Sequence, residues 1–196
     1  QQALAADPGS MEAQMGLAAS CERMGRNQQA IDGYRRIIKR WPRNIPARYL
    51  LANMLKAQGK FDEARALYQR IIVDQPDYTQ AHFTYSGIHR YREPTDPHIG
   101  TMLALLQSGG LPLEKQVQLA FALGKAFEDL EDYRQAFRYL ELGNRLRRSS
   151  FHYGIESDAE LIDNIIRTFN RGDVGRLQVE GLASRRPIFI VGMVRS

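Results

Sequence analysis

Apolar residues in the stretch Arg43–Pro76 recur at helical spacing on either side of a short polar turn. Positions three and four apart lie on one face of a helix, so each half of the stretch predicts an amphipathic helix. Gly59 separates the halves, because glycine readily adopts the left-handed conformation found at helix C-termini. Pro76 ends the unit, since proline has no amide hydrogen to continue a helix. The inward positions of the two helices are Leu51, Ala52, Met54, Leu55, Ala64, Leu67, Tyr68 and Ile71.

The same pattern recurs with a period of 34 residues. A fixed period of this length predicts stacked helix pairs, because one pair cannot bury its own apolar face. Small residues recur where the two helices of a pair must cross closely. The matching positions are Pro8, Pro42 and Pro76, Leu17 and Leu51, Ala18 and Ala52, Gly25 and Gly59, Ala30 and Ala64, Tyr34 and Tyr68, and Ile37 and Ile71.

These positions resemble the signature of the tetratricopeptide repeat. The resemblance implies an all-α fold, an α-solenoid of antiparallel helix pairs in a right-handed superhelix with a short extended C-terminal segment. We expect about four repeats over residues 1–148, an adaptor helix and connector over 149–186, and a separate element over 187–196. Gln1–Pro8 reads as the end of an earlier repeat, so we expect the chain to be part of a longer one.

The third repeat departs from the period. Its first helix is expected over Thr79–Tyr91, and the segment Arg92–Pro97 then replaces the short turn. Asp96 followed by Pro97 predicts a helix start, because aspartate caps exposed amides and proline suits the first helical position. The fourth repeat, Leu113–Arg148, returns to the pattern.

One more helix is expected after the fourth repeat. The sequence Ser157-Asp158-Ala159-Glu160 is a capping box, which predicts a helix that begins there and ends near Asn170. Its apolar residues share a face that we expect to point inward. They are Leu161, Ile162, Ile165, Ile166 and Phe169.

Composition narrows the class of protein. The chain has 43% hydrophobic and 25% charged residues, as ordinary soluble domains do. No apolar run approaches the roughly 20 residues that span a bilayer. Its single cysteine, Cys21, excludes an internal disulfide and fits a reducing compartment, so we expect a cytoplasmic location. The net charge of +5 comes without a basic block interleaved with aromatics, so we expect neither a nucleic-acid nor a membrane partner.

Candidate metal and thiol chemistry is weak. His82 and His89 are seven residues apart, with His98 further along, and two helical turns separate histidines too far to share an ion. We therefore expect no metal site. Cys21 falls on the inward stripe, which favours a small buried side chain over a reactive thiol.

A partner-binding face follows from the resemblance. In tetratricopeptide domains the first helix of each repeat lines the concave side. Chaperone-binding members clamp a terminal carboxylate there, but the clamp positions hold Met15, Ala19, Leu50, Gln80 and Thr84 in this chain. We expect an aromatic, weakly basic groove for a protein or an extended peptide, with an unoccupied solvated surface as the alternative. By position the groove residues are Met15, Ala19, Tyr49, Asn53, Phe83 and Arg90.

The last ten residues, PIFIVGMVRS, form a second informative stretch. Ile188–Val191 is a β-branched and aromatic run that predicts a buried strand. A strand followed by a glycine turn and an Arg-Ser pair is how many phosphate cradles begin. The segment resembles the start of a sulfotransferase domain, whose motif reads approximately PIFIVGMPRSGTT. The resemblance implies a parent protein that uses PAPS and leaves PAP, with Gly192, Arg195 and Ser196 at the 5′-phosphosulfate.

The fourth repeat is also similar to the repeat that precedes the catalytic domain in bacterial fusions of tetratricopeptide repeats with sulfotransferases. The resemblance therefore implies a non-catalytic, cofactor-free scaffold that belongs to a PAPS-dependent sulfotransferase. The alternative is a stand-alone tetratricopeptide adaptor with no enzymatic domain. For the strand Ile188–Val191 we expect packing against the preceding helix, with pairing to a second chain in a homodimer as the alternative.

Overall fold

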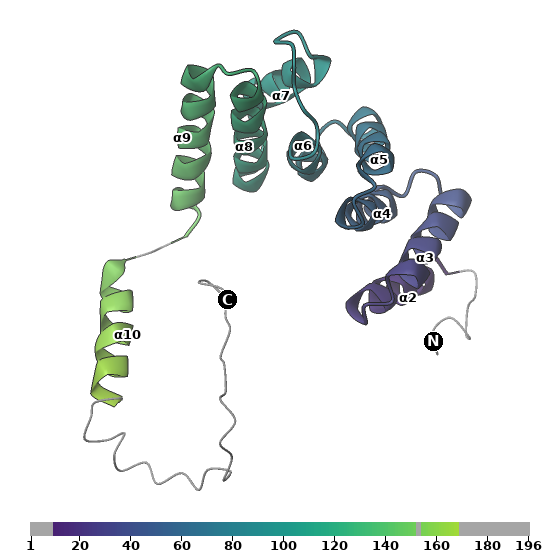
Figure 1. Cartoon of the computed structure of the whole chain (residues 1–196), viewed down its shortest axis with the longest axis horizontal. Helices are drawn as coiled ribbons and strands as arrows, with labels where there is room; N and C mark the ends of the chain where they lie inside the picture. Colours follow the sequence, from purple (N-terminus) through teal and green to yellow (C-terminus); the bar gives the residue numbers. More distant parts are fainter. Residues whose placement is uncertain (1–9, 152–153, 169–196) are drawn as a thin grey trace, which may run out of the picture. The chain divides into compact units, whose positions relative to one another are not determined.

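The structure is a computed structural model that describes residues 10–151 and 154–168 (Figure 1). The chain divides into two compact units after Phe151. Every regular element within the described ranges is an α-helix. The helices are α2 (Met11–Arg23), α3 (Asn27–Arg40), α4 (Ile45–Ala57), α5 (Phe61–Asp74), α6 (Thr79–Ser86), α7 (Pro97–Gln107), α8 (Leu113–Asp129) and α9 (Tyr133–Ser149) in the first unit, and α10 (Ile155–Thr168) in the second.

Helices α2 to α9 form the stack of helix pairs that the sequence period predicts. Helix α2 packs on α3, α4 on α5, and α8 on α9, in each case across a short turn. Neighbouring pairs are joined by contacts of α3 with α4, of α5 with α6, and of α6 with α8. The predicted all-α solenoid is therefore confirmed, and the handedness of its superhelix stays a prediction.

The turn inside each of the first two pairs depends on a glycine. Gly25 and Gly59 have φ of +70° and +75°, a conformation in which other side chains are strained. After Gly59, the Lys60 amide donates to the Leu55 carbonyl at 2.9 Å, and the Arg26 amide makes the equivalent bond to Cys21 at 2.8 Å. These bonds satisfy carbonyls that the helix ends leave open. The glycine therefore reverses the chain at the same place in both pairs.

Small residues let the helices of each pair approach closely. Ala30, Ala52 and Ala64 have no exposed surface. A Cβ placed on Gly33 would lie only 3.0 Å from the Ala18 Cβ, so α2 and α3 meet almost backbone to backbone. The larger side chains that fill the core beside these crossings are Ile31, Tyr34, Ile37, Leu51, Leu55, Tyr68 and Ile71.

An ion pair between a buried arginine and a more exposed aspartate fixes the corner where the second helix pair begins. Arg48 on α4 is 4% exposed, and its guanidinium donates to Asp74 Oδ2 at 2.7 Å. The same guanidinium donates to the Pro42 carbonyl in the preceding turn. The hydrogen bond from Arg48 lowers the pKa of Asp74, so the pair stays charged at neutral pH.

The third repeat diverges in a different way from the one expected. Helix α6 ends at Ser86, so the prediction of a helix as far as Tyr91 is wrong. Tyr91 instead leaves the helical path and is 1% exposed in a second core cluster with residues of α7 and α8. Its amide donates to Asp129 on α8 at 3.3 Å. Tertiary packing therefore ends the helix early. Helix α7 does begin at Pro97, and Asp96 accepts from the His98 amide as a cap.

Helix α10 differs from expectation at its start and at its face. It begins at Ile155, two residues before the expected cap at Ser157. The apolar side chains expected to point inward are exposed, with values from 49% at Ile165 to 62% at Ile166. No other described element belongs to its unit, so nothing described there covers this face. Phe169 lies outside the described residues.

The crossing of α4 and α5 generates a stability prediction. Ala64→Leu adds three heavy atoms to a position with no exposed surface, and overpacking of this kind costs about 1–3 kcal/mol. Ala66→Leu is the matched control, because Ala66 is exposed on the same helix. Urea unfolding should show a loss of stability for Ala64→Leu and almost none for Ala66→Leu. Equal stabilities of the two variants would contradict the assigned crossing.

Candidate functional site

Five of the six predicted groove residues lie on the first helices of the repeats. Met15 and Ala19 are on α2, Tyr49 and Asn53 on α4, and Phe83 on α6. Arg90 was expected on the same helix as Phe83, but α6 ends at Ser86 and Arg90 is an exposed residue of the following loop.

Tyr49 is held in place by its neighbours. Its ring meets the rings of Tyr68 and Tyr78 edge to face, at centroid distances of 5.9 and 5.4 Å. The Thr84 hydroxyl donates to the Gln80 carbonyl, so the Tyr49 hydroxyl is the donor in its 3.0 Å bond to Thr84. The bond ties α4 to α6. Asn53 is also engaged, because its Oδ1 accepts from the Tyr68 hydroxyl at 2.6 Å.

An aromatic ladder runs along the first helices. Met15, Tyr49 and Phe83 are spaced at the repeat period of 34 residues, and Phe121 on α8 follows Phe83 by 38 residues. Phe121 is the equivalent residue, because Gly124 on α8 takes the close-crossing place of Ala52 and lies three residues further on, as Ala52 does from Tyr49. The aromatic ladder is the set Tyr49, Phe83 and Phe121.

A pocket of about 310 Å³ opens beside the last two rungs of the ladder. Side chains from three first helices line it, which places it on the face where a partner was expected. Sequence reasoning found Phe83 and missed the rest of the lining. Phe121 could have been found by extending the Ala52–Gly124 equivalence across the longer third repeat. The lining residues are Lys56 on α4, Phe83, Thr84 and Ser86 on α6, Gly87 and Ile88 after α6, and Phe121 and Lys125 on α8.

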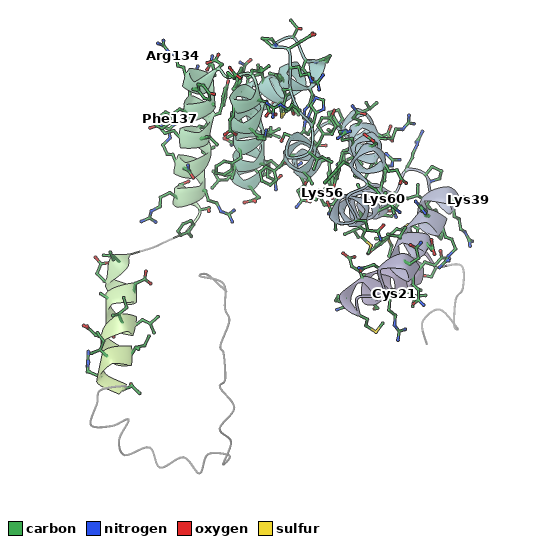
Figure 2. The ribbon with its side chains drawn as sticks, in the orientation of Figure 1. Cys21, Lys39, Lys56, Lys60, Arg134 and Phe137 are labelled. Carbon is green, nitrogen blue, oxygen red and sulfur yellow. The ribbon has the colours of Figure 1, made fainter. Side chains whose placement is uncertain are left out.

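The two lysines of the pocket differ in their partners. Lys125 Nζ lies 2.6 Å from Asp129 Oδ1, and the Asp129 carboxylate is 7% exposed. Lys56, labelled in Figure 2, makes no ion pair or hydrogen bond with any other described side chain, although it is only partly exposed. The pocket therefore carries one cation that the described part of the chain does not neutralise.

The histidines come together in a way that their spacing did not reveal. His82 has no exposed surface, and its ring stacks on that of His98 at a centroid distance of 4.9 Å. His89 stacks on Tyr85 at 4.8 Å, and its Nε2 lies 3.0 Å from Asp96 Oδ2. The loop that replaces the expected helix end thus folds back and brings His98 against α6.

Hydrogen bonds determine the tautomers of the two stacked rings. His82 Nε2 must donate to the Pro76 carbonyl at 2.8 Å, because a carbonyl only accepts. The neutral His82 ring then accepts at Nδ1 from His98 Nε2, at 2.9 Å. His98 Nδ1 in turn accepts from the Tyr91 hydroxyl at 2.7 Å. Each nitrogen of both rings is engaged in one continuous chain, so the geometry gives these histidines a structural role.

No group of three metal-binding side chains occurs in residues 10–151 and 154–168. Burial lowers the pKa of His82 and of His98, and for His98 to about 3, with the neighbouring His82 charge as a further cause. Both rings are therefore neutral at physiological pH, as the hydrogen-bond chain requires.

Cys21 is buried, as its place on the apolar stripe predicts. It is 7% exposed, and its thiol lies 3.8 Å from Gln29 Oε1. It borders a larger hollow of about 1120 Å³ between α2 and α3, at the first described helix pair. Gly192, Arg195 and Ser196, the predicted phosphosulfate residues, lie outside the described residues, as does the strand expected to pair or pack. None of the described helices is long and apolar enough to cross a membrane.

The buried histidines generate a prediction for the pH dependence of stability. Below pH 6.5 the histidines of the unfolded chain take up protons that the folded ones do not. The unfolded state therefore binds more protons, and the stability of the folded state decreases as the pH is lowered. The loss is up to about 1.4 kcal/mol per pH unit for each histidine. The pKa values of Asp74 and Asp77 are lowered, so these carboxylates stay ionised between pH 6.5 and 5. Urea unfolding across that range should show a smaller slope for His98→Gln, and an unchanged slope would contradict this account.

Comparisons with known proteins agree with the fold. A family model described as tetratricopeptide repeat matches residues 23–83. An uncharacterized protein of Aquifex aeolicus (strain VF5) is 30% identical over 175 residues, which are 88% of this chain and 22% of that protein. The chain thus spans less than a quarter of that relative's length.

Solved structures resemble this chain in fold alone, because their sequence identities are low. A crystal structure of MamA has a TM-score of 0.53 at 17% identity and covers 76% of this chain and 85% of its own. A crystal structure of BtubC (BKLC) from P. vanneervenii has a TM-score of 0.55 at 16% identity, and the match covers 74% of this chain and 66% of the BtubC chain. Residues 23–83 thus match the tetratricopeptide repeat, and the stack of helix pairs shares its fold with these solved structures.

Proposed function

We propose that this chain is a protein-interaction scaffold that binds an extended segment of another protein along the first helices of its repeats. The observation that carries the proposal is the aromatic ladder of Tyr49, Phe83 and Phe121 with the pocket beside it. Interfaces concentrate their binding energy in aromatic anchors and the pockets around them. A periodic row of such anchors suits a chain that runs across several repeats.

The exposed surface of the aromatic ladder supports binding of a partner near Phe83. Phe83 is 48% exposed, while Tyr49 is packed against the core. Covering apolar surface contributes about 25 cal/mol per Å², so an exposed phenyl ring is favourable to cover. Of the other exposed aromatic side chains, Phe61 on α5 and Phe137 on α9 lie on second helices, and Phe151 follows α9. Phe83 differs in that it borders a pocket.

The size and lining of the pocket favour a peptide over a small-molecule substrate. Small-molecule sites measure about 300–1,000 Å³, and this pocket lies at the bottom of that range. It fits one or two side chains of a bound segment. The carboxylate-clamp positions hold Met15, Ala19, Leu50, Gln80 and Thr84, so recognition of a chain terminus by that clamp is not proposed.

A peptide selection tests this function. A phage-displayed library of random twelve-residue peptides is panned against the full chain, and the affinities of recovered peptides are measured by fluorescence anisotropy. We expect binders whose affinity falls about thirtyfold or more in Phe83→Ser, because loss of a hot-spot residue costs at least about 2 kcal/mol. Phe61→Ser is the matched control, since Phe61 is 46% exposed and lies on a second helix.

Three results would contradict the proposal. One is the recovery of no binder from the library. Another is equal loss of affinity in Phe83→Ser and Phe61→Ser, which would place the peptide elsewhere. Tight binding of a peptide ending in Glu-Glu-Val-Asp through its terminal carboxylate would also contradict it, because the clamp residues are missing.

We further propose, from the sequence of residues 187–196, that the whole protein is a PAPS-dependent sulfotransferase and that the bound segment carries the acceptor hydroxyl. This proposal rests on the likeness of PIFIVGMVRS to the sulfotransferase motif. A stand-alone adaptor, without an enzymatic domain, fits the described solenoid equally well. We also keep the cytoplasmic location as a proposal, on the single cysteine.

A nucleotide titration tests how the sulfotransferase motif is assigned. This 196-residue chain should bind PAP no better than background, because the part of the motif that it carries offers a single arginine, Arg195, which supplies too few donors for the phosphates of PAP. Isothermal titration calorimetry with PAP measures this. Micromolar binding by this chain would show that the nucleotide site has been misplaced. A protein extended beyond Ser196 through a Gly-Thr-Thr continuation should bind PAP, and failure of that longer chain would contradict the sulfotransferase proposal.

A further inference from the structure

We propose that the pocket between α4, α6 and α8 selects an acidic and an apolar side chain on the same side of the bound segment, with Lys56 as the residue that binds the acid. The inference rests on the proposed peptide-binding function and names the chemistry of the partner. It assigns a specificity-determining role to a residue that the repeat pattern does not mark.

The charge balance of the pocket indicates that Lys56 binds an anion. The Asp129 carboxylate neutralises Lys125 at 2.6 Å and also accepts from the Tyr91 amide, so this lysine is held within the fold. Lys56 has no acidic partner among the described residues. Covering Lys56 with an apolar ligand would desolvate an unpaired charge, which is costly. A ligand that covers Phe83 and brings a carboxylate to Lys56 avoids that cost.

The hydrogen-bonding groups of the pocket carry the second step. The Thr84 hydroxyl donates to the Gln80 carbonyl at 2.9 Å. The Ser86 hydroxyl lies 3.0 Å from both the His82 and the Phe83 carbonyls, so its hydrogen is also used within α6. Lys125 is bonded to Asp129. The Lys56 ammonium is thus the side-chain donor of this lining that has no acceptor, and an anionic acceptor suits it best.

The rest of the lining selects the neighbour of the acid. Phe83, Ile88 and Phe121 provide apolar walls in a space of about 310 Å³. Adjacent side chains of an extended peptide point to opposite sides, and side chains two residues apart point to the same side. The acid and the apolar residue that enter this pocket together therefore fit as next-but-one neighbours. Charge complementarity and the aromatic walls therefore both point to a segment of acidic and apolar composition.

A positional-scanning library tests the assignment. The probe is a set of pools of degenerate ten-residue peptides. In each pool one position is fixed as Asp, Asn, Lys, Phe or Ser, or two positions separated by one residue are fixed as a pair of these residues. Binding of each pool to the full chain is measured by fluorescence anisotropy. The wild-type chain should prefer a pool with Asp and Phe separated by one residue over the matching Asn and Phe pool by about tenfold, because a hydrogen bond to a charged group contributes about 1.4 kcal/mol or more to affinity.

Variants of two lysines distinguish recognition of the acid by the pocket from attraction of the acid by the overall positive charge. Lys56→Met should abolish the preference for Asp over Asn and keep the preference for Phe over Ser. Lys56→Glu should reverse the sign and favour the Lys pool. Lys60→Met is the matched control, because Lys60 is an exposed lysine four residues away that does not line the pocket (Figure 2). It should bind like the wild type, and thermal melting of all three variants should match the wild type.

The outcomes distinguish this inference from the function on which it rests. If no pool binds the wild-type chain above background, the proposed peptide-binding function fails. If pools bind but show no preference for Asp, or keep that preference in Lys56→Met, the function stands and the assignment of Lys56 is wrong. Equal effects of Lys56→Met and Lys60→Met would likewise overturn it, because they would show that the overall positive charge attracts the acid.

Discussion

The close approach of two helices within each repeat is the constraint on which the rest of this structure depends. Gly33 lies so near Ala18 that a Cβ would come within 3.0 Å, and a Cβ on Gly124 would come within 2.7 Å of Leu140. Helices this close leave room for large side chains only beside the crossing, where Tyr34 and Tyr68 are fully buried. Because a crossing residue recurs in every first helix, the position three residues before it also recurs at the same place on each of these helices. The positions of the aromatic ladder are therefore set by the same contact that holds each pair together.

Much of the fold could be predicted from the sequence because its causes are local. The glycine turns and the Asp96 cap depend on neighbours a few residues away, and each small crossing residue meets only the other helix of its own pair. The early end of α6 could not be predicted, since it results from Tyr91 entering a core formed with α7 and α8. The exposed face of α10 was missed for a related reason, because an apolar stripe predicts burial without saying what covers it.

In the candidate site, too, some residues could be predicted from the sequence and others could not. Phe83 follows from the repeat period, and Phe121 would have followed once the four extra residues of the third repeat were counted. Lys56 could not be singled out from the sequence, because what distinguishes it is the lack of an acidic partner among the described residues. Lys125 has Asp129 four residues away on α8, whereas no described acid reaches Lys56. Only the assembled pocket distinguishes a lysine held by the fold from one left for a ligand.

The central claim is that the first helices of the repeats take the partner, and that the apolar faces left open on α9 and α10 do not. Both of those faces are real competitors, since Phe137 on α9 is 69% exposed and Ile166 on α10 is 62% exposed. Hydrogen–deuterium exchange of the full chain with and without a saturating selected peptide tests the claim most directly. The account predicts added protection in α4, α6 and α8, with α9 and α10 unchanged. Protection confined to α9 or α10 would contradict it.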